Sequence, residues 1–243
     1  MNNKYYKFPD SAEFGRVVSK SKIYQHVAVT SKVKALFVAQ VDQMIWSYKL
    51  SSATINLPAS DDVQEIQIFT IRLKTRVVSL DVLKTIDKAI PSPILFVLSY
   101  NGKYRYAAAY KRPSEADKNK WVVSSYFQSE WLKPQIDTDK HRLGNKEDNN
   151  IGVHPCSSVV KELPVVLNMR ALYEALLKDL IPQQSHGNES FQGLIDRAER
   201  ISKLEREAVK LENRIKKEKQ FNRRVELNRM LNELKTEIEE LKI

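Results

Sequence analysis

The sequence of 243 residues contains few of the residues that build common active sites. Its single cysteine, Cys156, excludes an internal disulfide framework and a cysteine-based zinc site. Its six glycines are scattered and form no glycine-rich phosphate-binding loop, which excludes P-loop and dinucleotide-binding fingerprints. No two of its four histidines have the i, i+4 spacing of a helical zinc site. We therefore expect neither a metal nor a cofactor.

Long apolar runs are also missing from the sequence. The longest, residues 94–98, is far shorter than the roughly 20 residues that a membrane span requires. The first nine residues lack the apolar stretch of a signal peptide. These features predict a soluble, cytoplasmic protein without a membrane partner.

Positive charge is abundant, with 40 Lys and Arg against 30 Asp and Glu. The excess lies in residues 1–120, whose net charge is +9, whereas residues 188–243 contain 14 cations and 12 acids. An anionic partner is therefore expected on the N-terminal half of the chain.

The spacing of apolar residues predicts an α+β domain over residues 1–182, with a mostly antiparallel sheet of about five strands flanked by helices. Residues 94–98 are apolar on both faces and predict a central strand, and Asn101-Gly102 predicts a tight turn after it. Residues 134–164 are polar and predict a long loop or insertion. Helices are expected at 31–44, 79–90 and 165–180, and strands at 45–50, 63–74, 94–100, 104–112 and 121–131.

A linker at residues 183–189 and a helical coiled-coil tail at 190–243 are predicted to follow. Two heptad seams run along the tail, one from Leu194 to Ile215 and the other from Leu227 to Leu241. Because the seams are out of phase, they favour a helical hairpin that turns within residues 216–224 over one continuous helix.

A basic and aromatic segment around the predicted turn is the first candidate site. Cations with exposed aromatic rings can hold single-stranded nucleic acid by phosphate contact and base stacking. The alternative is that the tyrosines line a core edge while the cations solubilise an edge strand. The candidate residues are Lys103, Arg105, Tyr106, Tyr110, Lys111, Arg112, Lys118 and Lys120.

A second basic stripe lies in the tail and has two interpretations, a phosphate-tracking face or a solvated helix with internal ion pairs. Its members, Lys203, Arg206, Lys210, Arg214 and Lys217, are spaced three or four residues apart.

Asp61, Asp62 and Glu65 precede a predicted strand that ends in Lys74, as acidic residues do in some metal-dependent nucleases. The acidic-x-lysine triplet expected of such a nuclease is missing, which favours a solvated strand start instead.

The tail also predicts a docking surface, because apolar residues on a charged helical scaffold commonly bind other helices. The alternatives are that this stripe packs on the protein's own sheet or pairs with itself in a homodimer. The candidate partner-binding residues are Phe191, Phe221, Val225, Met230, Leu231 and Leu234.

Six segments carry a resemblance that covers nearly the whole chain except about residues 136–161: ATINL (53–57), DVQEIQIF (62–69), IDKAIP (86–91), AYKRPS (109–114), LYEALL (172–177) and EKQFNRRVELN (218–228). Together they resemble the uncharacterised bacterial domain-of-unknown-function family numbered 4391. The resemblance implies a gene context beside a helicase and a DNA methyltransferase in restriction-like antiphage defence loci. It therefore implies a non-catalytic accessory subunit of a DNA-acting defence complex, with a divergent metal-dependent nuclease as the alternative.

Overall fold

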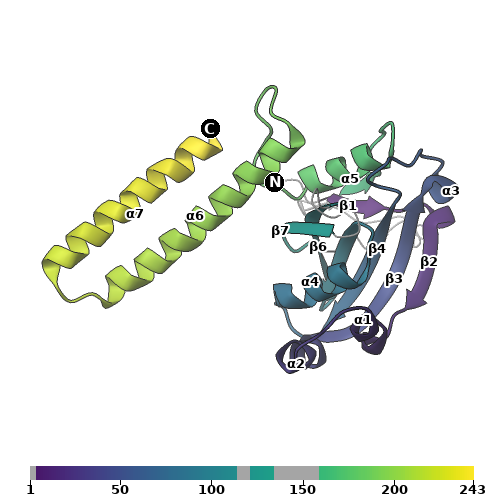
Figure 1. The fold of residues 1–243 in the computed structure, drawn as a ribbon, viewed down its shortest axis with the longest axis horizontal. Helices are drawn as coiled ribbons and strands as arrows, with labels where there is room; N and C mark the ends of the chain where they lie inside the picture. Colours follow the sequence, from purple (N-terminus) through teal and green to yellow (C-terminus); the bar gives the residue numbers. More distant parts are fainter. Residues whose placement is uncertain (1–3, 114–120, 134–158) are drawn as a thin grey trace, which may run out of the picture. The chain divides into compact units, whose positions relative to one another are not determined.

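The computed structural model describes residues 4–113, 121–133 and 159–243. The chain divides into two compact units, Met1–Leu180 and Ile181–Ile243. The first unit combines a β-sheet with helices, and the second contains two long helices (Figure 1).

In the described part of the first unit, six strands form one sheet in the order β2-β3-β4-β5-β6-β7. Neighbouring strands are antiparallel except β4 and β5, which are parallel because helix α4 (Leu80–Ala89) carries the chain back across the sheet. The predicted mostly antiparallel sheet is confirmed, with one strand more than the expected five. The strands are β2 (Glu13–Val17), β3 (Val41–Ser51), β4 (Glu65–Leu73), β5 (Ile94–Tyr100), β6 (Lys103–Pro113) and β7 (Trp121–Gln128).

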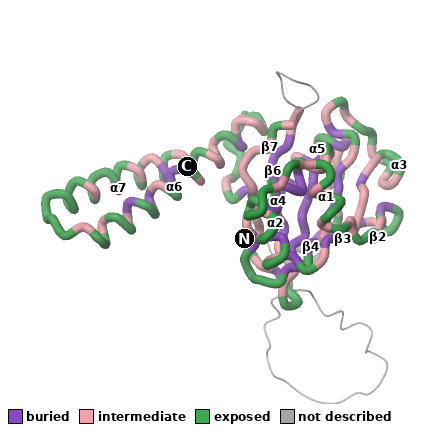
Figure 2. Tube along the Cα trace, turned by 60° about the horizontal axis from the view of Figure 1, so that its bottom comes forward, coloured by how far each residue is buried: buried purple, intermediate pink, exposed green. Residues whose placement is uncertain are grey.

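Strand β5 forms the centre of the core, as its apolar sequence predicts. All five residues from Ile94 to Leu98 are buried, and the purple segments of Figure 2 follow the strands of the sheet. Asn101 and Gly102 have φ angles of 46° and 69°, which confirms the predicted turn because a type I′ turn needs positive φ at both central positions.

Helices cover both faces of this sheet. Phe96 packs in a cluster with residues of α1 (Lys20–His26), α2 (Ser31–Gln40) and α4 on one face. Helix α5 (Met169–Lys178) contacts β4 and β6, and its Tyr173 stacks on Tyr110 of β6. Because side chains alternate along a strand, Tyr110 lies on the opposite face from Ala107, which belongs to the Phe96 cluster. The core is therefore built on both sides of β5 and β6.

Two predicted helices are shorter than the sequence pattern suggests. The predicted helix at 31–44 ends at Gln40, because residues from Val41 onward pair with β4 and bury Val41 and Met44. The predicted helix at 165–180 begins at Met169, where the side chain of Asn168 accepts a hydrogen bond from the backbone N–H of Ala171.

The pairing of β1 (Lys4–Lys7) with β8 (Val159–Glu162) was not predicted. These short parallel strands come from the two ends of the first unit, and β8 lies within the segment predicted as a polar loop. Further short elements are the 3-10 helix η1 (Asp10–Ala12) and helix α3 (Ser52–Ile55).

The second unit confirms the predicted helical hairpin. Helices α6 (Phe191–Lys217) and α7 (Phe221–Lys242) are joined by residues 218–220, inside the segment expected to turn. Ion pairs between Arg200 and Glu237 (2.5 Å) and between Glu212 and Lys235 (3.0 Å) show that the helices run antiparallel. The buried side chains between them are Ile201, Leu204, Ala208, Leu211, Leu231 and Ile238.

Among the described residues, none of the helices combines the length and apolar character needed to cross a bilayer.

Candidate functional site

The tyrosines of the candidate nucleic-acid site on β6 are part of the core. Tyr106 is 2% exposed, and its hydroxyl accepts a hydrogen bond from the backbone N–H of Tyr6 at 3.0 Å. Tyr110 is 8% exposed and packs on Tyr173. Neither ring is available to stack on a nucleic-acid base, so the prediction is wrong for these two residues.

Lys111 is also buried, and the prediction that it contacts phosphate is wrong. Its side chain is 1% exposed and its ammonium group lies 3.8 Å from a carboxylate oxygen of Asp87. The same ammonium donates to the carbonyl oxygens of Asp87 (2.7 Å), Ile90 and Ser92 (3.1 Å). These carbonyls lie at and beyond the end of α4, where a helix leaves carbonyls unpaired and favours a cation. Lys111 therefore ties β6 to the end of α4.

Hydroxyl groups complete this buried network from two sides. The hydroxyl of Tyr126 on β7 donates to the second carboxylate oxygen of Asp87. The hydroxyl of Tyr173 accepts from the backbone N–H of Lys111 at 2.9 Å and donates to the carbonyl oxygen of Ala109 at 2.6 Å. The network therefore links β6, β7, α4 and α5.

Burial disfavours the charged forms of both ionisable partners. It raises the pKa of Asp87 from 3.8 to about 6, although Lys111 and the Tyr126 hydroxyl oppose the shift. Burial lowers the pKa of Lys111 from 10.5 to about 8, opposed by Asp87. The pKa values of Tyr126 and Tyr173 are raised by burial and by the charge of Asp87.

Replacing Asp87 with asparagine should change how stability depends on pH between about pH 4 and 6. The native state holds the Asp87 proton to a higher pH than the unfolded chain, because the pKa is raised from 3.8 to about 6. The contribution of this carboxyl to stability is therefore complete below pH 3.8 and is lost as the pH rises through 6. Urea unfolding at several pH values should show this decline in the native sequence and not in Asp87→Asn.

The exposed Asp42 supplies the matched control for that experiment. The Asp42→Asn variant should follow the pH profile of the native sequence. If Asp87→Asn and Asp42→Asn have the same profile, the carboxyl of Asp87 is not desolvated as described.

Few cations of the predicted β6 site remain at the surface. Lys103 is exposed. Arg105 is half-buried, with its guanidinium 5.2 Å from the ring centre of Trp131 and a hydrogen bond to Gln128 at 2.9 Å. Arg112 is half-buried and makes contacts of its own. Lys118 and Lys120 lie outside the described residues. The described part of this candidate site is therefore poor in available cations and rings.

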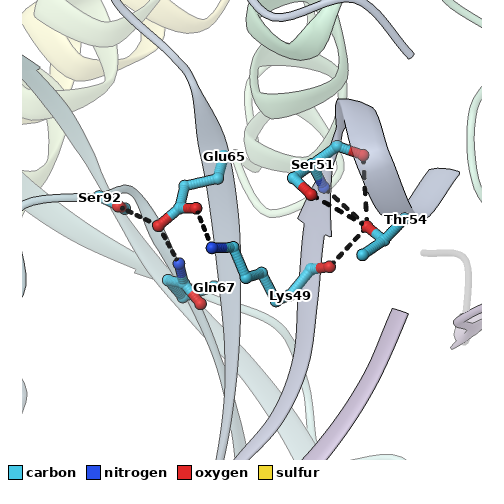
Figure 3. A network of polar contacts seen from close by, with 6 residues as sticks. All are labelled: Lys49, Ser51, Thr54, Glu65, Gln67 and Ser92. Atoms are coloured by element: carbon cyan, nitrogen blue, oxygen red, sulfur yellow. Dashed lines mark hydrogen bonds and ion pairs between the residues drawn. The ribbon is translucent and has the colours of Figure 1, made fainter. Parts of the chain in front are cut away.

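Two of the three acidic residues considered for a nuclease, Asp62 and Glu65, form ion pairs with cations of the chain, whereas Asp61 is exposed. Glu65 at the start of β4 forms an ion pair with Lys49 of β3 at 2.7 Å (Figure 3). Its carboxylate also accepts from the Gln67 side-chain amide at 2.5 Å and from the Ser92 hydroxyl at 3.0 Å. This cluster clamps the start of β4 to β3 and to the segment before β5.

Figure 3 also shows a second contact of Lys49, whose carbonyl oxygen accepts from the hydroxyl of Thr54 at 2.7 Å. Asp62, the neighbouring candidate, pairs with Arg170 of α5 at 3.1 Å. Within the described ranges, no three His, Cys, Asp or Glu residues gather as metal ligands would.

The predicted partner-binding residues of the tail divide into two groups. Leu231 is 7% exposed and Leu234 is half-buried against the same seam, so both stabilise the hairpin. Phe191 is half-buried and makes contacts of its own. The residues that remain exposed are Phe221, Val225 and Met230, with exposed fractions of 76%, 54% and 43%.

A groove runs along one side of the hairpin between α6 and α7. Leu211 and Leu234 line it together with the exposed Met230. Charged side chains of both signs also line it, namely Glu207, Lys210, Arg214, Glu233 and Glu237. An apolar floor with a charged rim matches one face of an amphipathic helix.

Sequence reasoning missed the concentration of positive charge at the turn of the hairpin. Residues 214–224, here called the hairpin tip, contain six cations and one acid, Glu218. The net charge of the whole tail does not indicate the tip, because acidic residues elsewhere in the tail balance the positive charge of the tip.

The fold and these sites define an α+β protein with a mostly antiparallel sheet and a separate antiparallel helix pair. The chain belongs to the family described as Domain of unknown function (DUF4391), which matches residues 7–238. No curated protein and no solved structure gives a match. The family is therefore shown, and its description assigns no chemistry.

Proposed function

We propose that the protein is a non-catalytic accessory subunit of a bacterial antiphage defence complex that acts on DNA. In this proposal it binds a helicase or a DNA methyltransferase subunit through the helical hairpin. The resemblance to the family suggests these partners, because it implies a gene context beside both enzymes.

The observation that carries the proposal is the groove between α6 and α7. Met230 is 43% exposed in this groove, although two apolar side chains, Leu211 and Leu234, also line it. The two helices bury six side chains between them but leave Met230 exposed beside the groove. A third helix from a partner would cover this groove and complete a three-helix arrangement.

The polar clusters of the first unit support an accessory role over a catalytic one. Lys111 and Asp87 are buried and hold β6 to α4. Glu65 is engaged by three side chains that connect neighbouring segments. These groups have the contacts expected of structural residues, and in this proposal the partner supplies the chemistry of the complex.

Replacing Met230 with glutamate should weaken partner binding in the full chain by about 10- to 100-fold, because apolar anchors at the centre of an interface contribute most of its affinity. Met230 is exposed, so the hairpin should remain folded, which far-UV circular dichroism would check. Binding to the purified helicase and methyltransferase of the same locus should be measured by titration calorimetry.

Val38→Glu on α2 is a matched control, since Val38 is 63% exposed and lies in the first unit. It should leave the affinity unchanged. If Val38→Glu weakens binding and Met230→Glu does not, the docking surface lies outside the hairpin. If the protein alone cuts phage DNA with Mg²⁺ or Mn²⁺, and Asp62→Ala abolishes cutting, the protein is a divergent nuclease instead.

A further inference from the structure

We propose that the hairpin tip, residues 214–224, is a binding site for single-stranded nucleic acid. Its cations contact the phosphates, and the ring of Phe221 stacks on a base. This inference refines the proposed function, in which the protein acts in a complex on DNA, and gives the nucleic-acid contact a place in the fold.

Positive charge is distributed unevenly along the hairpin. The tip has a net charge of +5 within eleven residues, half of the +10 of the whole chain. In the rest of residues 188–243, acids outnumber cations by 11 to 8. The positive charge is therefore gathered at one end of the hairpin, where it creates a local field that attracts polyanions. The six tip cations are Arg214, Lys216, Lys217, Lys219, Arg223 and Arg224.

The cations of the hairpin tip are available to bind a ligand. All six are exposed, and Figure 2 shows the turn between α6 and α7 as almost entirely exposed. In the described residues, none of the six forms an ion pair, whereas cations along the helices do. Those pairs include Arg200 with Glu237, Lys235 with Glu212 and Lys242 with Glu205.

The single acid of the tip does not remove this availability. The carboxylate of Glu218 accepts hydrogen bonds from the backbone N–H groups of Lys219 (2.9 Å) and Gln220 (3.0 Å). The Glu218 carboxylate therefore binds the backbone of the turn. These hydrogen bonds lower the pKa of Glu218 below its ordinary value, and the nearby charges of Arg223 and Arg214 lower it further. Glu218 therefore shapes the turn, and its single negative charge offsets only one of the six positive charges of the tip.

The hairpin tip also carries an exposed aromatic ring, that of Phe221. This residue is the first of α7, is 76% exposed, and lies between Lys219 and Arg223 in sequence. An apolar partner helix is a poor match for it, because docking would bury the adjacent charges without compensation. A nucleic-acid strand matches both features, since phosphates neutralise the cations and an unstacked base covers the ring. The bases of a duplex are already stacked, which favours a single strand.

The test is fluorescence anisotropy with a labelled 20-nucleotide single strand and the full chain, without any partner protein. With about five phosphate contacts, the affinity should fall about 100-fold between 50 and 200 mM salt. The triple variant Lys217→Glu, Lys219→Glu and Arg224→Glu should bind at least about 50-fold more weakly at low salt and lose most of this salt dependence.

The matched control reverses three exposed cations of the first unit, Lys22, Lys32 and Lys84, and so changes the net charge by the same amount. It should change the affinity by less than about 3-fold, since these residues are not at the tip. If both triple variants weaken binding equally, only the net charge matters and the tip is not a site. If the tip variant binds as the native sequence does, the proposal is also overturned.

Stacking is tested separately through Phe221. Phe221→Ala should weaken binding to the single strand by about 5- to 150-fold, and Phe221→Tyr should retain it. A 2-aminopurine base in the strand should be quenched by the native protein and not by Phe221→Ala. Unchanged affinity and quenching in Phe221→Ala would overturn the base contact.

The failure of this inference differs from the failure of the proposed function. The tip variants should still bind the helicase or methyltransferase through the groove at Met230. Loss of nucleic-acid binding with partner binding intact supports the separate site at the tip. A tip variant that loses only partner binding places the docking surface at the tip and overturns the inference.

Discussion

Replacing Lys111 with methionine should lower the free energy of unfolding by about 3–5 kcal/mol, because it leaves the buried carboxylate of Asp87 without its cation. The carbonyl oxygens of Asp87, Ile90 and Ser92 would also lose their donor. Methionine preserves most of the side-chain length, so lost packing contributes little. Urea or guanidinium unfolding at neutral pH measures the change.

Lys103→Met is the control on the same strand, where the lysine is exposed. It should change the stability by no more than about 0.5 kcal/mol. Combining Lys111→Met with Asp87→Leu should recover part of the loss, since an apolar pair can replace a buried ion pair. If Lys111→Met costs less than about 1 kcal/mol, Lys111 does not hold β6 to α4 as described.

Replacing Phe96 with alanine should cost about 3–5 kcal/mol of stability through lost burial and the cavity that remains. Phe96 is fully buried on the central strand β5, beneath α4 and between β4 and β6. A denaturant unfolding curve, with its midpoint and slope, gives the change.

Phe221→Ala provides the same chemical change at an exposed position. It should leave the free energy of unfolding within about 0.5 kcal/mol of the native value. Equal effects of the two variants would contradict the central placement of β5.

The parts of the fold that follow from local signals could be predicted from the sequence. The apolar run of β5 and the Asn101-Gly102 turn specify two strands and their connection within a few residues. The two out-of-phase seams of the tail likewise specify a hairpin, because a seam must face its partner along its whole length. In both cases the interacting residues belong to adjacent elements.

The fate of Lys111 could not be predicted in this way. A cation on an alternating strand is expected to face solvent, and nothing near Lys111 in sequence indicates burial. Its partners are Asp87 in the last turn of α4 and Ile90 and Ser92 after the helix, which reach the ammonium only when β6 has joined the sheet. The same holds for β1 and β8, which come from opposite ends of the first unit.

The candidate site could be predicted only in part, because charge was counted over segments that were too long. Residues 188–243 are almost balanced, yet the tip alone carries +5. Net charge counted over a segment as short as one turn and its flanking helix ends identifies the hairpin tip. The exposure of Phe221, in contrast, depends on which side chains pack between α6 and α7. It therefore becomes clear only from the structure of the hairpin.

Co-purification tests most directly whether the hairpin binds the partner. The helicase and methyltransferase of the same locus are co-purified with two forms of the protein, the full chain and a chain that ends at Leu180. We expect the full chain to retain a partner, whereas the shortened chain should retain none and should still unfold cooperatively. A shortened chain that is folded and retains the partner as strongly as the full chain would contradict the assignment of partner binding to the hairpin.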